Sequence, residues 1–255
     1  MDAKLGLFVI ARLRSSRLPE KMLADVAGRP ALQCVLERMS LPRLPEIRVL
    51  CTTVEPEDDV LAELGRRLGW IAYRGPVDDV LARYLGAATE HGLDFFVNVD
   101  GDDLLCSWEH VDLILERFAV TGADYICCTG LPFGAAPLGV KTSALADVCR
   151  RKKETDTQGW GKYFADSGRY RVERIAATGE GAGYRMTLDY PEDLAFFRAV
   201  LGRLGSAHEE LTIASIVAFL QANPEVAALS QAVSAAYYER FRTLHAGFDH
   251  SAFEA

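Results

Sequence analysis

The feature that most constrains this chain is an apolar run that ends abruptly in a basic loop. The run Leu5–Ile10 predicts a buried strand, and the next residues, 11–21, carry four cationic side chains together with two serines and a proline. In open α/β sheets, ligands bind at the carboxyl ends of the strands. Because guanidinium and ammonium groups suit phosphate oxygens, we interpret this loop as a polyphosphate site. The alternative is a solvated basic loop, but its position directly after a buried strand favours a binding site.

Strand-like and helix-like segments alternate through the first half of the chain. Apolar runs predict further strands at 47–52, 70–73, 95–99 and 125–128, with amphipathic helices between them. Such alternation is typical of a mostly parallel sheet with helices on both faces. We therefore expect a three-layer, Rossmann-like α/β fold.

The middle of the chain is less regular. We expect a loop at 130–139, which is rich in Gly, Pro and Ala, and a solvated helix along the charge run 150–156. Alternating residues predict two more strands at 170–176 and 184–188, joined by a glycine-rich turn.

After Pro191 the pattern is helical to the end of the chain. We expect an α/β domain over residues 1–205 and a helical extension over residues 206–255. The apolar stripe of that extension has two alternative uses, packing against the domain or forming the seam of a homodimer.

The overall charge argues against one class of partner. The chain of 255 residues has a formal net charge of −8, so it is a poor candidate for a non-specific nucleic-acid binder. The basic loop is then a local positive spot, which favours a small anionic ligand.

The six cysteines show no metal-binding spacing, so we expect reduced thiols and a cytoplasmic location. No signal peptide is expected, because no small-residue cleavage site follows an apolar segment at the N-terminus. No membrane span is expected, because no run approaches ~20 apolar residues.

Two acidic sites follow predicted strands. Asp102 comes after the strand at 95–99, and Asp189 comes after the strand at 184–188. If both lie at the carboxyl edge of one sheet, the two carboxylates suit Mg²⁺, which prefers oxygen ligands shared with phosphates and water. Each residue alone could instead be a turn residue or a helix cap. The combination with a cationic loop favours a nucleoside triphosphate and its metal.

The basic loop also resembles a known family. Its pattern Arg-x-x-Ser-x-Arg-Leu-Pro-x-Lys, carried here by Arg12, Ser15, Arg17 and Lys21, is similar to that of the cytidylyltransferases that make CMP-activated acid sugars. The branch called spore-coat polysaccharide biosynthesis protein F is the most similar. The resemblance implies a fold of the nucleotide-diphospho-sugar transferase type, with these four residues on the nucleotide phosphates and Arg12 and Lys21 taking part in catalysis.

Two further segments carry the same resemblance. The family's metal-binding positions match Asp102 and Asp189 here, and the run 74–84 resembles a branch-specific pattern. By that resemblance, Arg83 lies near the nucleotide and Asp79 helps to shape its pocket. The alternative for the latter pair is a helix-surface ion pair at four-residue spacing, worth only ~0.3–0.5 kcal/mol.

The chain also departs from the family pattern. Arg14 and Glu20 stand where small residues are usual, and Glu20 would weaken phosphate binding unless it faces solvent. Leu104 replaces a usual proline, and the middle segment lacks the branch's Glu-His-Val-Thr run near Asp156. The middle segment is where the acceptor is expected to bind. Relative to the family pattern, the residues expected to bind the nucleotide are therefore kept, and those expected to bind the acceptor are altered.

These observations support one preferred function and two alternatives. The resemblance implies an Mg²⁺-dependent cytidylyltransferase that transfers CMP from CTP to an acid sugar or a related small anionic acceptor, with release of pyrophosphate, in surface polysaccharide biosynthesis. A glycosyltransferase that uses a nucleotide sugar could be built on the same scaffold, although a diphosphate needs less positive charge. A degenerate nucleotide-binding module is the third reading, supported by the altered middle segment.

Overall fold

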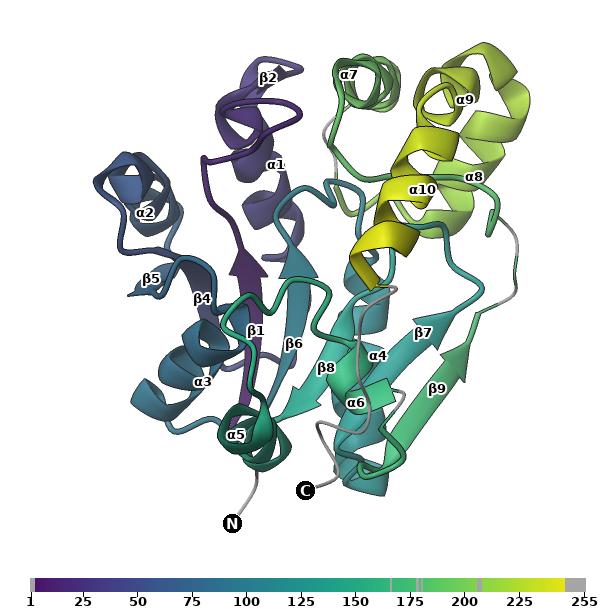
Figure 1. Ribbon diagram of the computed structural model, residues 1–255. Helices are drawn as coiled ribbons and strands as arrows, with labels where there is room; N and C mark the ends of the chain where they lie inside the picture. Colours follow the sequence, from purple (N-terminus) through teal and green to yellow (C-terminus); the bar gives the residue numbers. More distant parts are fainter. Residues whose placement is uncertain (1–2, 166, 178, 180, 206–207, 246–255) are drawn as a thin grey trace.

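A seven-stranded sheet forms the centre of the molecule (Figure 1). The computed structural model describes residues 3–165, 167–177, 179, 181–205 and 208–245. In the order β5-β4-β1-β6-β8-β7-β9, neighbouring strands are parallel except where β8 pairs with β6 and β7. The strands are β1 (Leu5–Ile10), β4 (Ile47–Thr53), β5 (Ile71–Gly75), β6 (Phe95–Asp100), β7 (Tyr125–Thr129), β8 (Leu138–Lys141) and β9 (Val172–Ala176), and a separate small hairpin joins β2 (Asp25–Val26) to β3 (Arg29–Pro30).

Helices cover both faces of the sheet. Their bounds are α1 (Ala31–Arg38), α2 (Asp59–Arg67), α3 (Val80–Glu90), α4 (Trp108–Thr121), α5 (Thr142–Arg151), α6 (Lys162–Ala165), α7 (Pro191–Leu204), α8 (Ile213–Ala222), α9 (Pro224–Gln231) and α10 (Ser234–His245).

Side chains that alternate along β1 enter two separate cores. Leu7 and Val9 belong to the larger core, which also contains residues of α1, α2, α4, α7 and α8. Phe8 points into the second core, which contains residues of α3 and α5. Because β1 is buried on both faces, its sequence is a continuous apolar run rather than an alternating one. The expected three-layer, mostly parallel α/β fold is confirmed.

The register of the central strands brings two loops together. Ile10, the last residue of β1, pairs with Asp100, the last residue of β6. The next residue after β6, Gly101, donates its backbone N–H to the Ile10 carbonyl at 2.8 Å. A Cβ atom on Gly101 would lie 2.6 Å from that carbonyl oxygen, so this crossing of the two chains requires glycine. The basic loop and the acidic loop therefore leave the sheet side by side.

Two expectations about the middle of the chain are wrong, and a third is confirmed in part. Residues 130–137 form the expected loop, with a single bridge at Phe133, but 138–139 belong to β8, which inserts between β6 and β7. Helix α5 ends at Arg151, so most of the charge run 150–156 is not helical. Residues 184–188 form a single bridge, Phe133 with Arg185, rather than a strand.

The segment 184–188 alternates like a strand for a different reason. Met186 and Leu188 are fully buried in the larger core, which accounts for the apolar positions. The Leu188 backbone N–H donates to the Asp102 carbonyl at 2.9 Å, so the segment runs beside the acidic loop instead of joining the sheet.

The C-terminal helices share the main core. Ile216 and Leu220 of α8 and Val226 of α9 belong to the cluster that contains Leu7. The division of the chain near residue 205 and the dimer seam stay predictions. By length and hydropathy, no single helix in the described ranges could cross a bilayer, although the bent pair Ile213–Ala222 and Pro224–Arg240 would meet that criterion together.

Candidate active site

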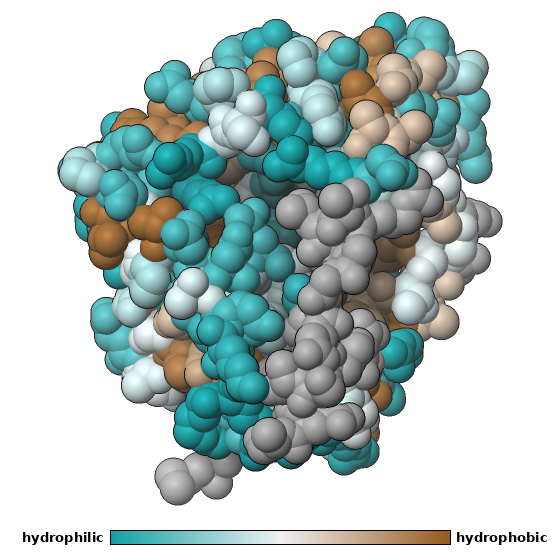
Figure 2. Space-filling view, viewed as in Figure 1, coloured by the Kyte–Doolittle hydropathy of each residue, from teal (hydrophilic) through white to brown (hydrophobic). Residues whose placement is uncertain are grey.

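A cavity of about 1100 Å³ opens at the carboxyl ends of β1 and β6. The basic loop and the acidic loop line one part of it, and residues 158–162 together with Arg240 line another. Figure 2 shows hydrophilic side chains across the middle of this face, with hydrophobic side chains scattered along its upper edge. The cavity is therefore a polar site at the edge where α/β sheets bind ligands.

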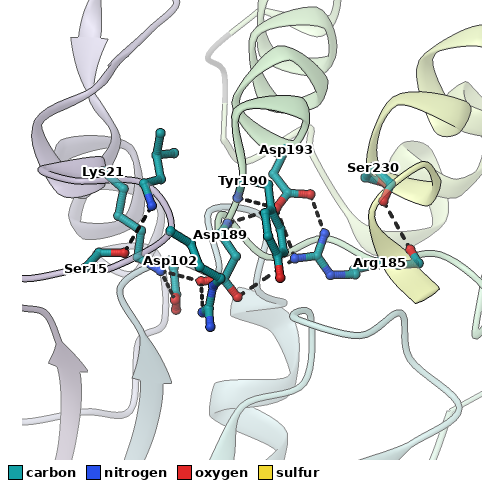
Figure 3. Close-up of polar contacts among 11 residues, drawn as sticks. Ser15, Lys21, Asp102, Arg185, Asp189, Tyr190, Asp193 and Ser230 are labelled. Atoms are coloured by element: carbon teal, nitrogen blue, oxygen red, sulfur yellow. Dashed lines mark hydrogen bonds and ion pairs between the residues drawn. The ribbon is translucent and has the colours of Figure 1, made fainter. Parts of the chain in front are cut away.

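Lys21 stands between two carboxylates (Figure 3). Its Nζ donates to Asp102 Oδ2 at 2.6 Å and to Asp189 Oδ1 at 2.8 Å. Arg17 also forms an ion pair with Asp189. These four residues come from the basic loop, the acidic loop and the segment before α7, so the structure brings together three regions that the sequence keeps far apart.

The charges in this cluster stabilise one another. Burial alone would lower the pKa of Lys21, but Asp102 and Asp189 outweigh burial and raise it. Burial alone would raise the pKa of Asp189, whose side chain is 4% exposed, but Lys21 and Arg17 outweigh burial and lower it. Lys21 and Asp189 therefore stay ionised at neutral pH.

A buried ion pair holds Asp189 in place. The Asp193 carboxylate accepts hydrogen bonds from the backbone N–H groups of Asp189 at 2.9 Å and Tyr190 at 2.8 Å. Its other partner is the Arg185 guanidinium, which is 1% exposed (Figure 3). From sequence, Asp193 reads only as an acid in the first turn of α7. Its spacing of four residues from Asp189 is the signal for its positioning role, and only the fold shows its partner.

A second buried carboxylate fixes the basic loop. Asp58, at 1% exposure, accepts a hydrogen bond from the backbone N–H of Leu13 at 2.7 Å and another from the Thr53 hydroxyl. This contact could not be predicted from sequence, because Asp58 reads as an ordinary acid in the first turn of a helix. The contact ties the backbone of the basic loop to the end of β4.

The remaining loop residues lie as follows. Arg12 and Ser15 line the cavity, and Arg12 Nη1 lies 3.4 Å from the Val77 carbonyl. Arg14 is exposed and also lines the cavity. Glu20 adopts a left-handed conformation, with φ 53°, and is exposed outside the cavity lining. The anion that the sequence placed near the phosphates is therefore turned toward solvent.

Arg83 and Asp79 do not form the ion pair that was the alternative for them. Arg83 is buried in the cavity wall, where it donates to the carbonyls of Pro76 at 2.9 Å and Val77 at 2.7 Å. Asp79 is outside the cavity lining and caps α3 by accepting from the Ala82 N–H at 3.0 Å.

Asp79 also anchors the middle segment. It forms an ion pair with Lys152 and accepts a hydrogen bond from the Thr157 hydroxyl at 3.3 Å. The Thr157 hydroxyl in turn accepts from the Leu81 N–H at 3.1 Å. These contacts fix the start of residues 158–162, which line the cavity.

The acidic loop could hold a divalent cation. Carboxylate oxygens of Asp100, Asp102 and Asp103 all lie within 4.8 Å of one another. Burial, with the charges of Asp102 and Asp100, raises the pKa of Asp103 well above its usual range. An all-oxygen donor set fits Mg²⁺ rather than a softer metal. Of the two predicted ligands, Asp102 belongs to this group, whereas Asp189 faces it across Lys21.

An open α/β sheet with a cationic loop and a carboxylate group at one strand edge defines a nucleotide-dependent transferase. A family model described as cytidylyltransferase matches residues 7–170, well over half of the chain. The chain therefore belongs to the cytidylyltransferase family, as its motifs predicted.

Individual relatives agree with this placement. The chain is 24% identical over 231 residues to the spore coat polysaccharide biosynthesis protein SpsF of Bacillus subtilis, which covers 87% of this chain and 96% of that protein. It is 30% identical over 144 residues to an uncharacterised protein of Methanocaldococcus jannaschii, which covers 56% and 59%. It is 32% identical over 113 residues to a 3-deoxy-manno-octulosonate cytidylyltransferase of Francisella tularensis, which covers 43% and 44%. The latter two matches thus span about half the length of those relatives.

Solved structures share the fold. A cytidylyltransferase from Leptospira borgpetersenii superposes with a TM-score of 0.82 at 22% identity, over 89% of this chain and 97% of that one. A CMP:2-keto-3-deoxy-manno-octonic acid synthetase in complex with CTP superposes with a TM-score of 0.61 at 18% identity, over 79% of this chain and 100% of that one.

Proposed function

We propose that this protein is an Mg²⁺-dependent cytidylyltransferase that transfers CMP from CTP to an acid sugar or a related acceptor, with release of pyrophosphate. One observation carries the proposal: a single cavity joins the basic loop after β1 to the carboxylates after β6, and Lys21 contacts both Asp102 and Asp189. Cations for a triphosphate and oxygen ligands for its metal are thus available in one place.

The family and two relatives support the choice of substrates. The family is named for cytidylyl transfer, and a structural neighbour is described in complex with CTP. One relative is named for an acid sugar, and another is named for spore coat polysaccharide biosynthesis. We extend these substrate and pathway classes to this chain as part of the proposal, so that it would act in surface polysaccharide or glycan biosynthesis.

The basic loop would bind and orient the triphosphate. An acceptor oxygen, either a carboxylate or an anomeric hydroxyl that gives up its proton to water, attacks the α-phosphorus, and the bond from that phosphorus to the departing pyrophosphate breaks. Arg12, Arg17 and Lys21 stabilise the charge that grows on the leaving pyrophosphate, and the Ser15 hydroxyl donates to a phosphate oxygen. Catalysis would come from positioning and charge stabilisation, with Arg12 and Lys21 nearest the reacting groups.

Carboxylates would hold the metal. Asp102 and Asp189 are the proposed ligands, with Asp100 and Asp103 adjacent to Asp102. Bound Mg²⁺ supplies positive charge for the phosphate oxygens. Asp193 keeps the Asp189 backbone in place, and Arg17 and Lys21 keep its carboxylate ionised.

The cavity wall beside the nucleotide is proposed to depend on Arg83 and Asp79. Arg83 holds the carbonyls of Pro76 and Val77 in a fixed position, and Arg12 contacts the same Val77 carbonyl. Asp79 acts one step away, because it holds Lys152 and Thr157 and through them the segment that lines the cavity. Both residues would therefore shape the nucleotide pocket without chemical participation.

A cytoplasmic location and a homodimer complete the proposal. All six cysteines are free thiols, which suits a reducing compartment. Ultracentrifugation of the purified protein would test the dimer.

Analysis of the reaction products tests the proposed activity. The protein is incubated with CTP, Mg²⁺ and a panel of sugar acids, and ³¹P NMR follows the phosphates. Pyrophosphate together with a new CMP phosphodiester is the expected result, and Asp102→Asn should abolish both signals. Asp59→Asn, which alters an exposed acid on α2, is the matched control and should keep them. Release of free nucleotide from a nucleotide sugar instead would indicate a glycosyltransferase.

A further inference from the structure

The cavity carries more positive charge than its nucleotide requires. Seven cationic side chains line it against three carboxylates, although the whole chain is acidic. A fourth carboxylate, Asp189, is not among the lining residues but pairs with Lys21 and Arg17, so the cations still exceed the carboxylates by three. CTP carries about four negative charges at neutral pH, and bound Mg²⁺ would offset about two of them. The surplus therefore leaves room for a second anion beside the triphosphate.

Three of these cations lie outside the basic loop, and one of them, Arg83, is already bound to the carbonyls of Pro76 and Val77. Lys162 is the first residue of α6, and Arg240 belongs to α10, yet both line the same cavity. Arg240 also lies beyond residues 7–170, the part of the chain that matches the family model. The C-terminal helix thus contributes a charged group to a site that is otherwise built from the first two thirds of the chain.

Helix α10 is attached beside the carboxylates by stacking contacts. The ring of Tyr237 lies 4.4 Å from the Arg185 guanidinium, and its centroid is 5.2 Å from that of Phe133. Arg185 is the partner of Asp193, which holds the backbone of Asp189. Because Arg240 follows Tyr237 by three residues, the two side chains share one face of the helix. The contact that anchors the helix therefore also directs Arg240 toward the site.

We propose that Arg240, together with Lys162, binds the carboxylate of the acceptor sugar and that α10 thereby selects acidic acceptors. This inference rests on the proposed function, because it assigns the acceptor side of the same cavity. A guanidinium recognises a carboxylate by paired, charge-assisted hydrogen bonds, which a neutral sugar does not make. Arg240 is thus a specificity residue, and the basic loop remains the site of the triphosphate.

Binding measurements test the assignment on the full chain. Calorimetry would measure the affinities of 3-deoxy-manno-octulosonate, N-acetylneuraminate and glucuronate, each beside its neutral methyl ester, with CTP titrated separately. We expect at least one acid to bind at least tenfold tighter than its ester and to lose that advantage in Arg240→Gln. Arg240→Lys should restore part of the affinity, because the charge is kept and the paired geometry is lost.

A matched control separates a local effect from a change in net charge. Arg66→Gln removes one exposed arginine from α2, outside the cavity lining, and should leave acid binding within twofold of the original protein. The inference is overturned if no acid binds better than its ester, or if Arg240→Gln binds the acids normally. It is also overturned if Arg240→Gln weakens CTP and not the acids, because Arg240 would then serve the triphosphate. Absence of CTP binding by the original protein would instead contradict the proposed function.

Discussion

Lys21 Nζ lies 2.8 Å from Asp189 Oδ1, and this contact joins two residues that are 168 positions apart in the chain. The same ammonium contacts Asp102, so one side chain connects the loop after β1 with both proposed metal ligands. The site is consequently complete only when the segment before α7 has docked against the sheet edge. A substitution in the loop after β1 should therefore also disturb the carboxylate of Asp189, and a substitution in the segment before α7 should also disturb Lys21.

Replacement of Lys21 by Ala should lower kcat by ~10²–10³-fold while the fold is kept. The ammonium is proposed to stabilise charge on the leaving pyrophosphate, and loss of such a group costs ~10²–10³-fold in kcat. Circular dichroism and a pyrophosphate-release assay would measure the two properties together. Lys141→Ala, which removes a partly exposed ammonium paired with Asp124, is the control and should retain normal rates. Near-normal turnover by Lys21→Ala would contradict the role proposed for the basic loop.

Replacement of Asp58 by Ala should weaken both the fold and nucleotide binding. The substitution leaves the buried N–H of Leu13 without its acceptor, which costs ~1–3 kcal/mol of the free energy of unfolding. Because the same N–H belongs to the basic loop, the KM for CTP should rise several-fold. Denaturant unfolding and steady-state kinetics would check the two effects. A variant that is less stable but has an unchanged KM would show that Asp58 supports only the fold.

Replacement of Asp193 by Ala should destabilise the protein more than any surface change. It leaves the buried Arg185 guanidinium with only the more distant Asp189 carboxylate, at 3.8 Å, and a broken buried pair costs ~3–5 kcal/mol. The double variant Arg185→Met with Asp193→Leu should recover part of this loss, because no buried charge is then left alone. Chemical unfolding of the three proteins measures the effect, and equal stability of the single variant and the original protein would refute it.

The stability of the protein should fall in mild acid because of His208. Burial, followed by the charges of Arg38 and Arg29, lowers the pKa of this side chain to about 4. Unfolding would restore a pKa of ~6.5, so between these two pKa values the unfolded chain binds a proton that the folded chain does not. The free energy of unfolding should therefore rise with pH from 4 to 6.5.

The size of this effect can be isolated with one variant. Between pH 7 and pH 5, His208 should account for a loss of ~1–2 kcal/mol. His208→Gln, which does not titrate, should show a smaller loss over the same interval when unfolding is measured at both pH values. Identical pH dependence in the two proteins would mean that His208 does not contribute.

The elements that depend on local pattern were predictable from sequence. The apolar run of β1 and the amphipathic helices predicted the layers of the fold, because a strand that is buried on both faces is a continuous apolar run and a helix that is buried on one face has apolar residues at three- and four-residue spacing. Strand β8 was missed because it has four residues and its Gly139 packs where a Cβ atom would lie 2.5 Å from Phe95. A glycine in such a place reads as a loop when its neighbours in space are unknown.

The candidate site likewise contains some residues that could be predicted from sequence and others that could not. Lys21, Asp102 and Asp189 could be proposed because each follows a predicted apolar segment and matches a motif. Asp58 and Arg240 could not be proposed, because they act through contacts with residues distant in the chain: Leu13 for Asp58, and the cavity itself for Arg240. Segment 184–188 was wrongly predicted to be a strand, because the burial of alternate residues in the core produces the same pattern as a strand.

The measurement that tests the central claim most directly is a thermal-shift comparison of the four nucleoside triphosphates, each with and without Mg²⁺. A ligand at 100 times its dissociation constant should add ~2.7 kcal/mol to the free energy of unfolding, which raises the melting temperature clearly. We predict a shift that is largest with CTP, that depends on Mg²⁺ and that disappears in Asp102→Asn. Equal shifts with all four nucleotides, or none with CTP and Mg²⁺, would contradict the assignment of this cavity to CTP.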